Sequence, residues 1–94
     1  MEKTKQKLPK WFDGELYKEG EEVTNPYSGQ SYDLTAEELS MYDFIMGANQ
    51  LMEKGIYAPK MINDMHKGIM WFRKNNVEVY YVLLSITNNN YGKL

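Results

Sequence analysis

The sequence predicts a mainly α-helical domain, three helices with a small N-terminal β-hairpin, and three observations lead to that class. A capping box and a terminating glycine bound one long helical segment, and an apolar stripe at helical spacing marks a second. Short aromatic runs separated by turn residues precede both. With 94 residues, 43% of them hydrophobic, we expect one domain over residues 9–87, a flexible basic arm over 1–8 and a flexible tail over 88–94.

The region from residue 11 to residue 34 predicts one or two β-hairpins, because turn pairs such as Asp-Gly and Asn-Pro punctuate short runs of aromatic and β-branched residues. In TNPYSGQSY, Pro26 presets a turn dihedral angle and Gly29 can take a positive φ, which suits a hairpin loop of about four or five residues. Tyr27 lies at the loop tip. It either contacts a partner or only forms part of the turn, and the sequence leaves both open.

The first helix should span residues 36–54. Thr35 and Glu38 form a capping box at its start, and Gly55 suits a left-handed residue at its end. Its broad apolar stripe, predicted to face the core, is Met41, Phe44, Ile45, Ala48, Leu51 and Met52. A second stripe, on a separate face, is Leu39, Tyr42 and Met46. A helix with two apolar faces needs two neighbours.

The second helix should span residues 59–74, with Pro59 at its first position. Its predicted core stripe is Met61, Ile62, Met65, Ile69 and Phe72. Gly68 lies at the edge of the stripe and costs about 1 kcal/mol relative to alanine, which suggests close approach of another backbone. Met70 and Trp71 lie off the stripe, and Trp71 needs a cover from the N-terminal hairpin or from a second chain.

The third element is ambiguous between a short helix over residues 77–86 and a buried strand. Its β-branched and aromatic residues favour a strand by propensity. The pair Asn75 and Asn76 makes a good corner between helices, one of them serving as the N-cap, and the apolar residues run continuously rather than alternating. We favour the helix and keep the strand as the alternative.

Charge is distributed unevenly along the chain. The net charge is −2, with +3 on residues 1–10, −9 on residues 11–53 and +4 on residues 54–94. This asymmetry suits internal complementarity or head-to-tail self-association, and solvated surface charge is the plain alternative. The basic start leads into no apolar signal region, and the longest apolar run, VYYVLL, is too short to span a bilayer. We therefore expect a soluble, intracellular protein without membrane contact.

Residues that could carry chemistry are few. The single histidine, His66, has no carboxylate and nucleophile nominated beside it, and the chain has no cysteine. The acidic cluster Glu19, Glu21 and Glu22 lacks the ligand spacing of a calcium loop. No glycine-rich phosphate loop or catalytic serine or zinc motif occurs. The sequence predicts no enzymatic activity, no catalytic residue, no cofactor and no metal site.

Nucleic-acid binding has two weak supports in the sequence. One is the lysine arm, Lys3, Lys5, Lys7 and Lys10, and the other is the WFRK segment, residues 71–74, where stacking and phosphate contacts could combine. A sequence pI near 5.4 argues against it. No predicted helix carries the dense Lys/Arg face on which such modules rely.

Two stretches resemble a known group of proteins. WFDGELYKEGEEVTNPYSGQSYDLTAEELSMYDFIMG, followed by WFRKNN, is similar to short uncharacterised proteins of marine tailed bacteriophages, cyanophage-like in character. The likeness covers roughly residues 8–84, with NP-Y-SG, ELSMYDFI and WFR-NN as its carriers. It implies no activity, cofactor or site residue. It does imply a setting, either the cytoplasm of an infected bacterial host or a minor component of the virion.

The function that these observations favour is a non-enzymatic interaction module. It would bind a protein partner, either a second copy of itself as a homodimer or a phage or host protein. The alternative is a nucleic-acid-associated accessory protein that uses the lysine arm and residues 71–74. The candidate partner-binding residues are Tyr27, Leu39, Tyr42, Met46, Met70 and Trp71.

Overall fold

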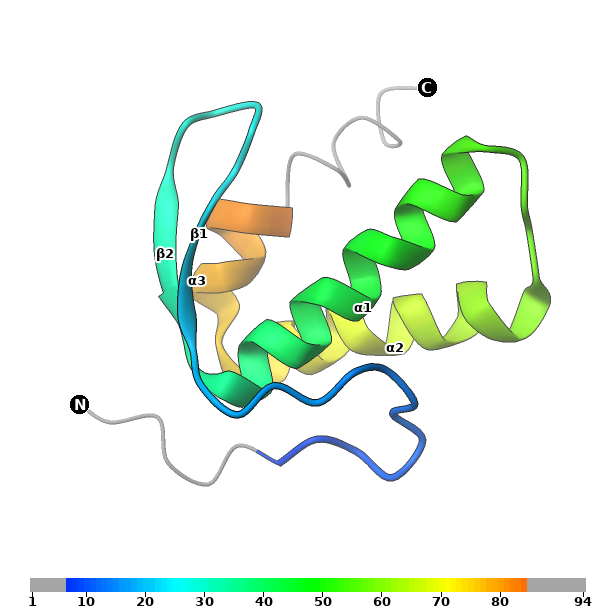
Figure 1. Ribbon diagram of the computed structural model, residues 1–94, viewed down its shortest axis with the longest axis horizontal. Helices are drawn as coiled ribbons and strands as arrows, with labels where there is room; N and C mark the ends of the chain where they lie inside the picture. Colours follow the sequence, from blue (N-terminus) through cyan, green and yellow to red (C-terminus); the bar gives the residue numbers. More distant parts are fainter. Residues whose placement is uncertain (1–6, 85–94) are drawn as a thin grey trace.

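A computed structural model describes residues 7–84 (Figure 1). In chain order the elements are β1 (Glu21–Thr24), β2 (Ser31–Leu34), α1 (Ala36–Glu53), α2 (Pro59–Asn75), α3 (Val77–Val79) and η1 (Tyr80–Leu84), a π-helix that continues α3. The predicted class, a mainly α-helical domain of three helices with a small hairpin, is confirmed. Most of the predicted basic arm, the end of the third helix and the predicted tail lie outside the described residues.

A single antiparallel hairpin precedes the helices. Thr24 pairs with Ser31, and Val23 pairs with Tyr32. The loop is closed by a hydrogen bond from the backbone N–H of Asn25 to the carbonyl of Gln30, at 2.7 Å. Gly29 has the positive φ predicted for it, at 78°. Residues 11–20, where the sequence left room for a second hairpin, form no strand.

Helix α1 begins and ends as the sequence predicts. The amide of Glu38 donates to Thr35 Oγ1 at 3.2 Å, and the amide of Thr35 donates to Glu38 Oε1 at 2.9 Å, which completes the capping box. Gly55 follows the last turn with φ of 90°. Because a left-handed residue is easiest for glycine, the chain turns sharply there towards α2.

Helices α1 and α2 pack closely at Gly68. A Cβ atom on Gly68 would lie 2.9 Å from Met41 Sδ and 3.1 Å from Ile45 Cγ1. The expectation that another backbone approaches Gly68 closely was therefore wrong. The atoms nearest to Gly68 belong to side chains of α1. The loss of helix propensity at Gly68 is offset by this packing, in which Met41 and Ile45 are buried.

The third element is helical rather than a strand over the residues described. Val79 and Leu83 are buried four residues apart, whereas Tyr81, which a strand would place on the same face, is 63% exposed. Asn76 stands at the corner, but its side chain makes no capping bond. Its side-chain amide, Nδ2, instead donates to Glu38 Oε2 at 2.8 Å, and this hydrogen bond connects the corner to the start of α1.

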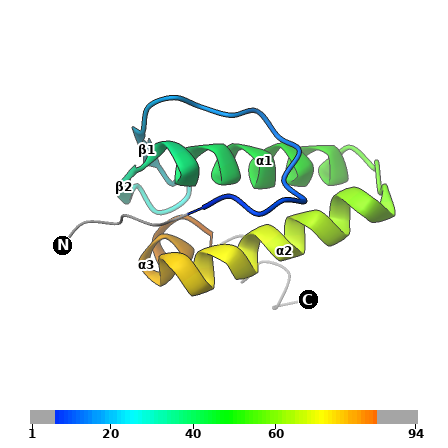
Figure 2. The same ribbon diagram turned by 90° about the horizontal axis from the view of Figure 1, so that it is seen from below.

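The N-terminal segment, residues 7–20, runs across α1 and α2 without regular structure (Figures 1 and 2). Its aromatic residues Trp11 and Phe12 pack on Phe44 of α1, with ring centroids 6.2 Å and 5.6 Å away. The amide of Tyr17 donates to the buried Ser40 Oγ at 2.9 Å. The N-terminal segment thus contacts α1 at Phe44 and Ser40, whereas α2 packs against Met41 and Ile45.

Candidate docking surface

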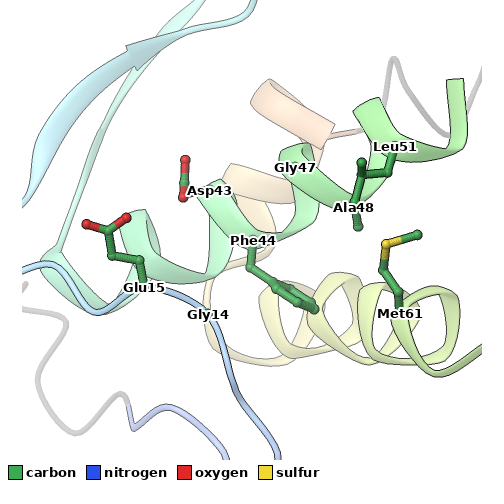
Figure 3. A pocket seen from close by; sticks show the side chains of 8 residues that line it. All are labelled: Gly14, Glu15, Asp43, Phe44, Gly47, Ala48, Leu51 and Met61. Atoms are coloured by element: carbon green, nitrogen blue, oxygen red, sulfur yellow. The ribbon is translucent and has the colours of Figure 1, made fainter. Parts of the chain in front are cut away.

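An open groove of about 290 Å³ lies between the N-terminal segment and the two long helices (Figure 3). Its lining residues are Gly14 and Glu15 from the N-terminal segment, Asp43, Phe44, Gly47, Ala48 and Leu51 from α1, and Met61 from the first turn of α2. Sites for drug-sized ligands span roughly 300–1,000 Å³. The groove lies at the lower end of this range and has room for one or two side chains.

The lining of the groove is mainly apolar. Phe44, Ala48 and Leu51 come from successive turns of α1, and Met61 faces them from α2 (Figure 3). The connection between the two helices adds exposed Ile56, whose amide donates to the carbonyl of Leu51. Apolar surface therefore continues from the groove towards that end of the domain, as is common for surfaces that bind partners.

Two carboxylates, Glu15 and Asp43, lie at the other end of the groove (Figure 3). Neither forms an ion pair with another residue between Lys7 and Leu84. The pKa of nearby Tyr17 is raised, first by burial of its hydroxyl and then by the negative charge of Asp43 and Glu15. This end of the groove is consequently an electronegative site that would attract a cation.

Gly47 is an exposed glycine in the middle of α1, on the wall of the groove. A Cβ atom placed on it would meet no neighbouring atom of residues 7–84 within 4 Å. A glycine in a helix interior costs about 1 kcal/mol relative to alanine, and Gly68 recovers that cost through packing with α1. Packing within the domain gives no such reason for Gly47. A glycine does, however, let a partner approach the helix backbone closely.

Helix α2 carries a second distinctive surface, here called the basic face, on its solvent side. Met70 lies at its centre and is 57% exposed. The residues three and four positions away on either side, all exposed, are His66, Lys67, Arg73 and Lys74. Lys67 Nζ lies 5.7 Å from the centre of the Trp11 ring, and the Arg73 guanidinium lies 5.3 Å from that of Tyr80. These contacts hold two of the cations beside Met70.

The six predicted partner-binding residues do not form one surface, and none of them lines the groove. Tyr27 is 65% exposed at the tip of the hairpin loop, and Met70 lies on the basic face. Leu39 is buried, 8% exposed, and Tyr42 and Met46 are partly buried against the core. A partner would therefore reach little of the second stripe of α1.

Trp71 contacts its own chain, but through the N-terminal segment and Phe72 rather than through the hairpin that the sequence suggested as a cover. Its indole Nε1 donates to the carbonyl of Lys7 at 3.0 Å, and its ring packs edge-on against Phe72. Met70, its neighbour in the sequence, remains open to a partner.

Two features of the sequence indicate the groove, although neither was used to predict it. Gly47 stands in the middle of the predicted first helix, and Asp43 stands directly beside Phe44 of the apolar stripe. Phe44, Ala48 and Leu51 were assigned to the core; Ala48 is buried there and Phe44 packs partly buried against it, whereas Leu51 is exposed, and all three also line the groove. The contribution of Gly14 and Glu15 has no local signal, because it depends on the path of the N-terminal segment.

Within residues 7–84, no three histidine or acidic side chains gather as a metal ion would require. No helix in the same range is long and apolar enough to cross a membrane. Comparisons with protein-family models, with curated proteins and with solved structures found no match to this chain.

Proposed function

We propose that this protein is a non-enzymatic protein–protein interaction module and that the groove is its docking surface. The observation that supports this best is the combination found there: an apolar lining, two carboxylates without an ion-pair partner in the described chain, and Gly47 on the wall. This chemistry is complementary to an apolar side chain flanked by Lys or Arg. The resemblance to phage proteins, and the host cytoplasm or virion that it implies, stays a prediction.

The groove would be the anchor point of a larger contact. Stable interfaces bury roughly 1,200–2,000 Å² in total, far more than one groove provides. A few residues near the centre of such an interface carry most of the binding energy, and they fill pockets from which water is excluded. The exposed apolar residues Ile56 and Tyr57, which follow α1, could extend the contact beyond the groove.

The alternative function, nucleic-acid association, receives no specific support from the arrangement of residues 71–74. The Trp71 ring is partly buried, its N–H group donates to the carbonyl of Lys7 and its ring packs against Phe72, so these contacts account for Trp71 within the domain. The groove itself carries negative charge, which would repel phosphates.

A peptide titration followed by amide chemical shifts tests the proposal. The probes are short helical peptides with a central methionine, flanked three and four positions away by Lys and Arg, by Gln or by Glu. We expect the cationic peptide to shift the amides of Gly14, Gly47 and Leu51 most, and the Glu peptide to leave them unchanged. Peptides that shift no groove amide, or shift amides elsewhere, would contradict the proposal.

A pair of matched variants separates the groove from general surface charge. The groove variant, Glu15→Gln with Asp43→Asn, removes the charge of the two groove carboxylates. The control variant, Glu22→Gln with Asp33→Asn, removes the charge of two exposed carboxylates that are cross-strand neighbours in the hairpin. Both variants change the net charge equally. Only the groove variant should weaken binding of the cationic peptide, and equal weakening would show that binding follows net charge alone.

A further inference from the structure

We infer that the occupant of the groove is the basic face of α2 from a second copy of this chain. Met70 of one copy would enter the apolar part of the groove, and the cations around Met70 would meet Glu15 and Asp43 of the other copy. This inference rests on the proposed function, because it names the partner of the same groove.

The basic face has the chemistry that the groove requires. Met70 is an unbranched, adaptable side chain, a type common at binding surfaces, and it projects from a helix of 17 residues. Lys67 and Arg73 lie three residues before and after it, so that cations stand on both sides of one apolar anchor. Because the helix is already formed, little ordering entropy opposes docking.

Charge complementarity between the two halves of the chain supports the pairing. Residues 11–53 carry a net charge of −9 and contribute seven of the eight lining residues of the groove, whereas residues 54–94 carry +4 and include the whole basic face. Copies that meet groove to face bring opposite charges together, and copies that meet groove to groove bring like charges together. Long-range attraction therefore favours the first encounter.

A copy cannot fill its own groove in this way. Met61 in the first turn of α2 lines the groove, and Met70 lies nine residues further along the same rigid helix. At 1.5 Å per residue this separates them by roughly 13 Å along the axis. The side chain of Met70 thus needs the groove of another molecule.

The contact joins two different surfaces, which determines the assemblies that it can form. Two copies related by a two-fold axis could each place a basic face in the other's groove and close as a homodimer. If the geometry does not close, copies add head to tail. Both assemblies contain the same contact, and both depend on protein concentration.

A charge-exchange experiment tests the contact. The groove variant carries Glu15→Lys and Asp43→Lys, and the face variant carries Lys67→Glu and Lys74→Glu. Sedimentation equilibrium on the full chain at low salt measures the dissociation constant of each variant, of their equimolar mixture and of one chain with all four changes. Circular dichroism and urea unfolding confirm that each variant is folded.

We expect each variant alone to associate at least about tenfold more weakly than the unaltered chain, because like charges then meet. The mixture and the fourfold variant should recover association, since each again pairs opposite charges. A second variant, Met70→Glu, changes an exposed residue and should abolish association without loss of the fold.

Three results would overturn the inference. If the unaltered chain is monomeric at millimolar concentration but its groove binds the cationic peptide, the second copy is the wrong partner and the proposed function stands. If it is monomeric and binds no peptide, both fail. If the unaltered chain associates but the charge changes do not alter its dissociation constant, the contact lies elsewhere. If the effects of the charge changes do not depend on protein concentration, the chain fills its own groove.

Discussion

Replacement of Asn25 by alanine should destabilise the domain more than any other change in the hairpin loop. Asn25 is only 1% exposed although it lies in a loop. Its side-chain amide donates to the carbonyl of Val82 in η1 at 3.0 Å, across 57 positions in the sequence. Its Oδ1 accepts from the amide of Tyr27 at 2.8 Å, which holds the loop in its turn.

The magnitude follows from these two contacts. Loss of the amide removes the side-chain donor to the part-buried carbonyl of Val82, and an acceptor left without a partner costs about 1–3 kcal/mol. The backbone amide of Tyr27 can bind water in place of Asn25 Oδ1, since the Tyr27 ring beside it is exposed. Loss of this second hydrogen bond therefore adds only about 0.5–1 kcal/mol to the destabilisation. We expect Asn25→Ala to lower the free energy of unfolding by about 1.5–4 kcal/mol, a large part of the stability of a small domain.

Urea unfolding followed by circular dichroism measures this change, and two further variants interpret it. Ser28→Ala removes an exposed acceptor for the amide of Gln30 in the same loop and should cost less than about 0.5 kcal/mol. Asn25→Asp keeps the acceptor for Tyr27 but loses the donor to Val82, and should cost at least as much as alanine. An alanine variant within about 0.5 kcal/mol of the original, or an aspartate variant that restores stability, would refute the reasoning.

Three other outcomes can be measured by the same unfolding assay. Gly20→Ala should cost about 2–4 kcal/mol, because the new Cβ atom would collide with the backbone carbonyl of Leu34, which cannot turn aside as a side chain could. Gly47→Ala should raise stability by about 1 kcal/mol, since its Cβ atom meets open space, yet weaken the self-association measured by sedimentation; loss of stability would contradict the structure there. Burial raises the pKa of Tyr42 above its ordinary 10.0, so its contribution to stability is complete below pH 10 and is lost as pH rises through the raised pKa. Tyr42→Phe should therefore make the alkaline fall in unfolding free energy less steep, and an unchanged fall would exclude this residue as a cause.

The features that the sequence predicted correctly depend on residues close together in the chain. The capping box joins Thr35 and Glu38, three positions apart, and the positive φ angles belong to single glycines, Gly29 and Gly55. Local geometry decides such features before any tertiary contact forms. For the same reason the bounds of α1 agree with the prediction almost to the residue.

The features that could not be predicted join residues far apart. Asn25 was assigned to a turn, which is correct, but nothing near it in the sequence points to its bond with Val82. One residue of the pair Asn75 and Asn76 was predicted to cap the third helix, but the side chain of Asn76 instead reaches Glu38, 38 positions earlier. A residue with several possible hydrogen-bond partners takes the one that the tertiary fold brings nearest, and periodicity contains no information about that choice.

The groove belongs to this second kind of feature. One of its walls is the N-terminal segment, which has no helix or strand of its own and is held by side-chain contacts: Tyr17 on Ser40, Phe12 on Phe44, and the Lys7 carbonyl on Trp71. These contacts can be lost without breaking the hydrogen bonds inside α1 or α2. One wall of the groove thus depends on these tertiary contacts rather than on the hydrogen bonds of a helix or strand, which is why no local sequence pattern predicts it.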